Sequence, residues 1–192
     1  MAVTPPPAPL PGARLLFSLD PTVAYLNHGS FGAVPIPVQR AQQRLRDEVE
    51  TNPQQFYTAG LWDRLGHART HLSQFLGADP ASTAFVANAT AAVSVVLRTL
   101  AFGPGDEIIT TAHGYGSVAL AVDHTCARTG ATHTVVPLRL DSSDDAIVTA
   151  VAAAITPGRT KLVIVDEVAS ATARVLPVAR LAAAARDRKS VV

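Results

Sequence analysis

Four short polar turns hold the side chains that are best suited to bind a small molecule. They are residues 88–90, 113–117, 166–172 and 27–30. The first turn, Asn-Ala-Thr, ends in a hydroxyl group at the expected start of a helix, where free backbone N–H groups and the positive end of the helix dipole favour an anion. An ordinary helix cap explains the same pattern, so this turn alone leaves both interpretations open.

Aromatic rings and hydroxyl groups occupy two of the other turns. His113 and Tyr115 could present flat rings to a ligand, because the neighbouring glycines allow a tight turn. Residues 114–119 also fit a loose G-x-G-x-x-A dinucleotide pattern, but no acidic residue ends the next predicted strand to hold a ribose. Ser170 and Thr172 follow the most apolar predicted strand and suit a phosphate or a phenolate oxygen. A solvated polar loop explains these hydroxyl groups equally well.

Two histidines and the single cysteine are weaker candidates. His67 and His71 are four residues apart on a predicted helix, a spacing that can bind zinc, but no third ligand accompanies them. Cys126 lies within an apolar helical pattern, and we interpret it as a core residue. These residues indicate neither a metal site nor a nucleophile.

The elements that carry the turns alternate between strands and helices. Such alternation predicts the α/β class, with a mainly parallel sheet, flanking helices and a preceding N-terminal helical segment. Glycine and proline signals separate most of the elements. The expected strands are 83–86, 107–110, 134–137 and 161–166, and the expected helices are 38–49, 61–76, 90–100, 117–129, 144–155 and 178–188.

The chain is predicted to have three parts. Residues 1–18 are a proline-rich arm that we expect to be disordered. Residues 19–77 form an N-terminal helical segment, and residues 78–192 form the first part of a large α/β domain. Residues 189–192 look like the start of another strand, so we expect this domain to be truncated, because a strand–helix unit normally returns to its sheet.

Composition narrows the class of protein further. Sixteen basic and fifteen acidic residues give a net charge of +1, which is too even for a protein that binds nucleic acid. Hydrophobic residues make up 48% of the chain, which excludes a disordered protein. No apolar run has the length needed to span a membrane. The single cysteine cannot form an internal disulfide, so we expect a cytoplasmic protein.

Several motifs, taken together and in this order, carry a resemblance to a known family. They are YLNHGSFGAVP at 25–35, FVANATAAV at 85–93, GPGDEII at 103–109, HGYG at 113–116, and ASAT at 169–172 before VLPV at 175–178. This set resembles the class V aminotransferase family of enzymes that use pyridoxal 5'-phosphate (PLP), and in particular its isopenicillin N epimerase-like branch. The resemblance extends from about Leu19 to the end of the chain. It implies the large-domain fold of PLP-dependent transferases.

The resemblance also implies roles for individual residues. Ala89 and Thr90 would hold the cofactor phosphate through a backbone N–H group and a hydroxyl group. Tyr115 is at the position of the ring that stacks on the pyridine. Ser170, with Thr172 nearby, is at the position that contacts the phenolic oxygen of the cofactor.

A small-molecule amino acid is the substrate that the family implies, and a homodimer is the expected assembly. Epimerisation, transamination and elimination are all reactions of such enzymes, and the PLP ring supports each by withdrawing electrons from the substrate Cα. The resemblance assigns the substrate side of the pocket to Asn27, His28 and Ser30.

The sequence departs from the family pattern in two ways. Glu167 stands where a histidine is expected. The Asp-Gly-Ala-His stretch and the later lysine that binds the cofactor covalently do not occur, and the only lysines are Lys161 and Lys189. Lys161 opens a predicted strand at the end opposite the expected site. We therefore expect that no catalytic residue is present and that the 192-residue chain is inactive alone.

Three other interpretations remain open. The chain could be a non-catalytic α/β module that binds a phosphate or a nucleotide, since such binding needs no lysine. The parent enzyme could be a cysteine desulfurase or a lyase. A pseudoenzyme fragment that pairs with another chain is the third alternative.

Overall fold

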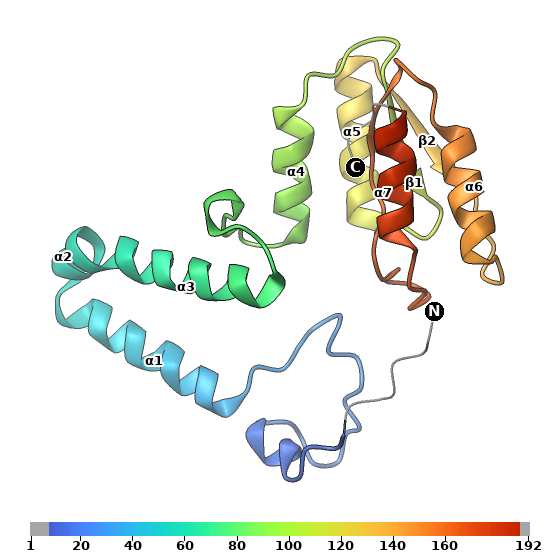
Figure 1. The fold of residues 1–192 in the computed structure, drawn as a ribbon. Coiled ribbons are helices and arrows are strands. Elements are labelled where there is room, and N and C mark those ends of the chain that lie inside the picture. Colours follow the sequence, from blue (N-terminus) through green and yellow to red (C-terminus); the bar gives the residue numbers. More distant parts are fainter. Residues whose placement is uncertain (1–7, 189–192) are drawn as a thin grey trace. The chain divides into compact units, whose positions relative to one another are not determined.

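A computed structural model of the chain describes residues 8–188 (Figure 1). The chain divides into two compact units, residues 1–84 and residues 85–192, and each is described by itself. Of the predicted arm 1–18, residues 1–7 lie outside the described part. Ala13–Leu16 form one turn of 3-10 helix.

The first unit is built around a pair of long helices. Helix α1 (Ile36–Thr51) starts after Pro35, and Asn52 ends it. The side chain of Asn52 accepts a hydrogen bond from the Gln55 N–H group at 3.1 Å, and so caps the short helix α2 (Pro53–Gln55). A π-helical turn, Phe56–Gly60, leads into the second long helix.

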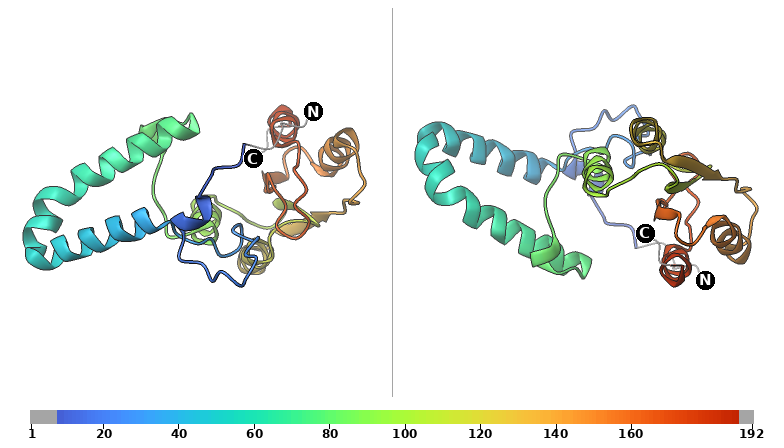
Figure 2. Two further views of the ribbon diagram at one scale, coloured as in Figure 1. Left: turned by 90° about the horizontal axis from the view of Figure 1, so that it is seen from below. Right: turned by 90° about the horizontal axis from the view of Figure 1, so that it is seen from above.

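The second long helix, α3 (Leu61–Leu76), ends at Gly77 as the sequence predicts. An ion pair between Arg64 and Glu48 joins α3 to α1, and the Arg64 guanidinium also lies 5.0 Å from the centre of the Phe56 ring. The bidentate contact with Arg64 lowers the pKa of Glu48. The two helices therefore form a hairpin whose turn is held by side chains (Figure 2).

The second unit is a three-layer α/β structure with a parallel sheet, which confirms the predicted fold class. The order of the strands is β2-β1-β3, and β1 pairs in parallel with both neighbours. Helices α4 and α5 cover one face, while α6 and α7 cover the other (Figure 2). The bounds are β1 Glu107–Thr111, β2 Thr132–Val136, β3 Thr160–Val163, α4 Ala89–Thr99, α5 Gly116–Thr129, α6 Asp144–Ala154 and α7 Val178–Asp187.

Alternate residues of β1 supply two separate cores. Ile109 packs with Ile147 and Leu181 beneath α6 and α7. Ile108 packs with Leu97 and Val122 beneath α4 and α5. Because both faces of β1 are covered, all five of its residues are buried, and the polar Glu107, Thr110 and Thr111 are buried with the two isoleucines.

Two of the predicted strands are wrong in part or in whole. Residues 83–86 are extended but pair with no described strand, because no neighbouring strand lies beside them. The predicted strand 161–166 is shorter, and it ends at Val163. Val163 is already opposite Ile109, so only two residues of β1 remain beyond that point, and the chain then leaves the sheet.

The amino ends of the three strands are joined by a buried carboxylate. Glu107 accepts hydrogen bonds from the hydroxyl groups of Thr134 on β2 and Thr160 on β3, each at 2.6 Å. Its side chain is buried, so the two hydroxyl donors offset the cost of removing the carboxylate from water. This contact ties β1 to both neighbouring strands near the amino edge, beside the shift in the β1–β3 register between Glu107 and Ile108.

No helix within residues 8–188 is long and apolar enough to cross a membrane.

Candidate functional site at the carboxyl edge of the sheet

The start of α4 offers hydrogen-bond donors to an anion. Asn88 caps the helix, and its side-chain oxygen accepts from the Ala91 N–H group at 2.8 Å. The N–H groups of Ala89 and Thr90 precede the first possible acceptor within the helix, so they stay available. Thr90 is half-buried, and its hydroxyl group has no hydrogen bond to any residue that the structure describes. This arrangement suits a phosphate.

The turn after β1 brings an aromatic ring to the same edge. The Gly114 N–H group donates to the Thr111 carbonyl at 2.9 Å. A Cβ at position 114 would lie 3.1 Å from that carbonyl oxygen, so the tight turn favours glycine. Tyr115 follows directly before α5, and half of it is exposed. Its ring is therefore free to contact a flat ligand.

His113 connects this turn to two other loops. Its Nδ1 lies 3.3 Å from the Thr172 hydroxyl oxygen, and its Nε2 lies 2.9 Å from the Leu138 carbonyl oxygen. Leu138 follows β2 and Thr172 follows β3, so the imidazole joins the loops that leave all three strands. The sequence indicated His113 as a ring that could face a ligand, but the Leu138 partner is a backbone atom and leaves no signal in the sequence.

The loop after β3 is a small hairpin that presents two hydroxyl groups. Val168 and Val175 form an isolated antiparallel bridge. The Ala169 N–H group donates to the Arg174 carbonyl at 2.9 Å. Ala173 has a φ of 53°, a left-handed conformation that closes the tip. Ser170 and Thr172 are exposed at this tip.

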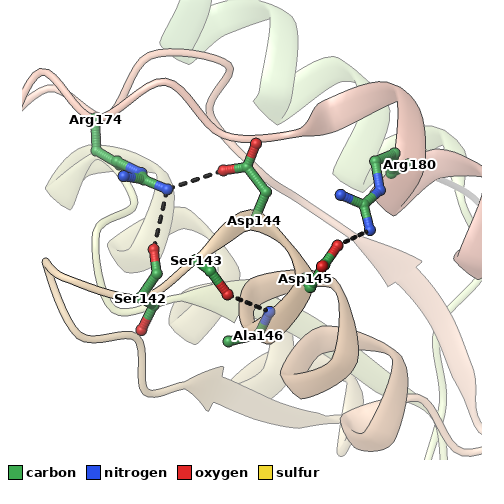
Figure 3. Close-up of polar contacts among 7 residues, drawn as sticks. All are labelled: Ser142, Ser143, Asp144, Asp145, Ala146, Arg174 and Arg180. Atoms are coloured by element: carbon green, nitrogen blue, oxygen red, sulfur yellow. Dashed lines mark hydrogen bonds and ion pairs between the residues drawn. The ribbon is translucent and has the colours of Figure 1, made fainter. Parts of the chain in front are cut away.

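An arginine fastens this hairpin to the start of α6 (Figure 3). The Nη2 atom of Arg174 donates to the Asp144 carboxylate at 2.9 Å and to the Ser142 carbonyl at 3.0 Å. An ion pair between Arg180 and Asp145 holds α7 to the same helix end. The sequence did not predict the role of Arg174, because its partners lie about thirty residues earlier in the chain.

The Asn27–Ser30 turn lies in the first unit. The Ser30 N–H group donates to the Asn27 side-chain oxygen at 3.2 Å. His28 accepts from the Ala33 N–H group at 3.3 Å, and its ring meets the Tyr25 ring edge to face. The turn is thus ordered by its own contacts, and its role in binding substrate stays a prediction.

Lys161 lies far from the polar turns of the carboxyl edge. It is the second residue of β3, and its amino group is 3.8 Å from the Asp106 carboxylate at the amino edge. The other lysine, Lys189, lies outside the described residues.

Comparison with known proteins gives a consistent result. The family model described as Aminotransferase class-V matches residues 34–192. Isopenicillin N epimerase from Amycolatopsis lactamdurans is 35% identical over 181 residues, which cover 92% of this chain and 45% of that protein. The putative L-cysteine desulfhydrase 1 of Oryza sativa subsp. japonica is 32% identical over 179 residues, which cover 86% and 37% respectively. The chain thus spans less than half the length of these relatives.

Solved structures share the fold. A mutant of C-DES with glycine covalently linked to its PLP cofactor superposes with a TM-score of 0.81 at 26% identity, over 93% of this chain and 47% of that one. The cysteine desulfurase CsdA from Escherichia coli superposes with a TM-score of 0.75 at 22% identity, over 93% and 46% respectively. The second likeness, at its lower identity, supports the fold alone.

Proposed function

The chain belongs to the aminotransferase class-V family, and on this premise we propose that it forms the cofactor-binding part of a PLP-dependent enzyme that acts on an amino acid. One observation supports the proposal above all. An anion-binding helix start, an exposed ring and a pair of hydroxyl groups occur in the turns around one edge of one sheet, where ligands bind in open α/β folds.

The residues present fit the cofactor. We propose that the Ala89 N–H group and the Thr90 hydroxyl group hold its phosphate, since both are free donors at the start of α4. The Tyr115 ring stacks on the pyridine, and it is exposed enough to do so. The Ser170 hydroxyl group, with Thr172 beside it, contacts the phenolic oxygen.

When bound, the cofactor supplies an electron sink that acidifies the substrate Cα–H bond. The protein's share is to orient the substrate and to move a proton at that carbon. We propose that Asn27, His28 and Ser30 line the substrate side. Relatives named as epimerase and as cysteine desulfhydrase favour epimerisation, with cleavage of a C–S bond as the second candidate.

We further propose that the 192-residue chain does not catalyse alone. Covalent attachment of the cofactor needs an amine aimed at its aldehyde, and Lys161 lies at the opposite edge of the sheet, beside Asp106. A homodimer in the cytoplasm is the proposed form of the complete enzyme. The proposed organisation keeps the arm 1–18, the helical segment 19–77 and the cofactor-binding part 78–192.

A non-catalytic phosphate or nucleotide module is the alternative function. The start of α4 supports it, because backbone N–H groups bind a phosphate without any ring or lysine. The two functions make different predictions for Tyr115, because stacking on the cofactor requires its ring and phosphate binding by backbone N–H groups does not.

The test is to measure the binding of PLP and of inorganic phosphate separately. Tyr115→Ala removes the stacking ring, and we expect it to weaken PLP binding about tenfold or more, since aromatic contacts contribute about 0.5–1.5 kcal/mol beyond the buried area. Phosphate binding should stay unchanged. Tyr57→Ala is the matched control, because Tyr57 has a similar exposure but lies in the first unit. If Tyr115→Ala left the binding of PLP and the binding of phosphate both unchanged, the phosphate module would be supported instead.

Reduction with borohydride tests the absence of catalysis in the same sample. We expect reversible binding without a stoichiometric adduct between cofactor and lysine. A single modified lysine together with racemisation of an amino acid would contradict this part of the proposal.

A further inference from the structure

His113 precedes Tyr115 by two residues and contacts the Thr172 hydroxyl group of the 166–172 loop, and the proposed function gives it no role. We propose that His113 is a positioning residue: it holds the Thr172 hydroxyl group, and so leaves Ser170 as the hydroxyl group that donates at the phenolic oxygen of the cofactor. This inference rests on the proposed function. It gives different roles to the hydroxyl groups of Ser170 and Thr172, which the sequence pattern alone does not distinguish.

The directions of the hydrogen bonds follow from elementary chemistry. The Leu138 carbonyl oxygen can only accept, so the His113 Nε2 atom, 2.9 Å away, carries the hydrogen. In the neutral ring the Nδ1 atom is then a bare acceptor. The Thr172 hydroxyl oxygen, 3.3 Å from Nδ1, must therefore donate its single proton to the ring. Thr172 has no proton left for a ligand.

The Thr172 oxygen is also engaged from the other side. It accepts from the Arg174 N–H group at 3.4 Å, within the hairpin that the Asp144–Arg174 ion pair fastens to α6. Two partners thus hold Thr172 in place. The Ser170 hydroxyl group has no hydrogen bond to any residue from 8 to 188 and is exposed, so its proton is free to meet an oxyanion.

Two substitutions at position 113 separate the two bonds of the ring. The side-chain oxygen of asparagine reaches the place of Nδ1, so His113→Asn can still accept from Thr172 but loses the Leu138 carbonyl. The side-chain nitrogen of glutamine reaches the place of Nε2, so His113→Gln can still donate to Leu138 but releases Thr172. A role through Thr172 predicts that Gln is the more harmful change, and a role in merely fastening the Leu138 loop predicts the reverse.

Nitrogen NMR of the imidazole tests the first step in the full chain without cofactor. We expect the tautomer with hydrogen on Nε2. A ring with hydrogen on Nδ1 would overturn the inference, because Thr172 would then be free to donate.

Titration with PLP tests the second step by affinity and by the position of the absorption band of the bound cofactor. We expect His113→Gln to weaken binding about tenfold and to shift the band, Ser170→Ala to shift the band most, and His113→Asn to recover most of the loss seen with Gln. In a Thr172→Val background, His113→Gln should cause no further change. His67→Gln, an exposed histidine on α3, is the control and should behave as the unmodified chain.

The outcomes separate the two claims. If the unmodified chain binds no PLP, the proposed function fails and this inference fails with it. If the unmodified chain binds PLP but Asn is more harmful than Gln, or the effect of Gln persists in the Thr172→Val background, the inference alone is overturned. Circular dichroism of each variant confirms that the loss is not one of folding.

Discussion

Cys126 shows how burial decides the chemistry of a single residue. Its thiol group is partly buried on α5, and burial raises the pKa of Cys126, with the charge of Asp123 raising it further. The thiolate is the reactive form, so a raised pKa means less thiolate at neutral pH. We expect iodoacetamide to alkylate the folded chain more slowly than a free cysteine peptide at pH 8.

Unfolding the chain in urea should expose the thiol group and separate it from the charge of Asp123. The rate of alkylation should then equal that of the free cysteine peptide. Asp123→Asn should speed the reaction less than urea does, because burial is the larger cause. A folded chain that reacts as fast as the peptide would show that the thiol group is open to solvent.

The residue types of the turns predicted the candidate site, whereas the contacts that hold those turns in place could not be predicted. Thr90 and Tyr115 stand at the starts of predicted helices, so their positions followed from local signals. The partners of His113 and Arg174 are backbone carbonyls and side chains 25 to 59 residues distant along the chain. Only the folding of strands side by side creates such contacts, and no local pattern encodes them.

At the level of elements, α5 ends at Gly130, which lies close to Pro104. Gly130 has a φ of 78°, and a Cβ there would lie 3.1 Å from Cγ of Pro104. Gly158 has a φ of 83° but no atom within 4 Å of its Cβ position. We expect Gly158→Ala to lower the free energy of unfolding by about 1–2 kcal/mol from backbone strain alone, and Gly130→Ala to lower it more.

Urea unfolding followed by circular dichroism measures both variants, and the difference between them isolates the contact with Pro104. Equal losses would show that Pro104 moves aside freely. A smaller loss for Gly130→Ala would contradict the close contact altogether.

Helices were easier to predict than strands for a physical reason. A helix satisfies its hydrogen bonds within itself, so apolar spacing and Gly77 were enough to place α3. A strand exists only beside another strand. Residues 83–86 have the composition of a strand but no neighbour, and β3 stops where its contact with β1 ends. The sequence therefore indicated which segments of the chain could be extended, but not which of these segments would pair in the sheet.

At the level of the whole molecule, the chain passes from the first compact unit to the second through an exposed segment outside helices and strands, residues 83–86. Phe85 lies in it with half of its surface exposed, while Phe75 is more exposed but lies within α3. Proteases need extended backbone, so we expect chymotrypsin to cut after Phe85 before it cuts after Phe75. The fragment 86–192 keeps both cores and should stay folded.

Mass spectrometry of a short digest identifies the first cut. Phe85→Ala should delay the digestion, whereas Phe75→Ala should not. A cut after Phe75 before the cut after Phe85 would contradict the expected order, and rapid loss of the 86–192 fragment would show that the second unit depends on the first for its stability.

The buried Glu107 has a consequence for how such a protein can change over generations. It ties β1 to β2 and β3 near the amino edge through Thr134 and Thr160, at the edge opposite the turns that we propose bind the cofactor. Alignment of the strands is thereby secured without help from those turns. Mutations in the loops at the carboxyl edge can then accumulate while the scaffold stays aligned, so new specificities of the proposed site are open to selection at little risk to the fold.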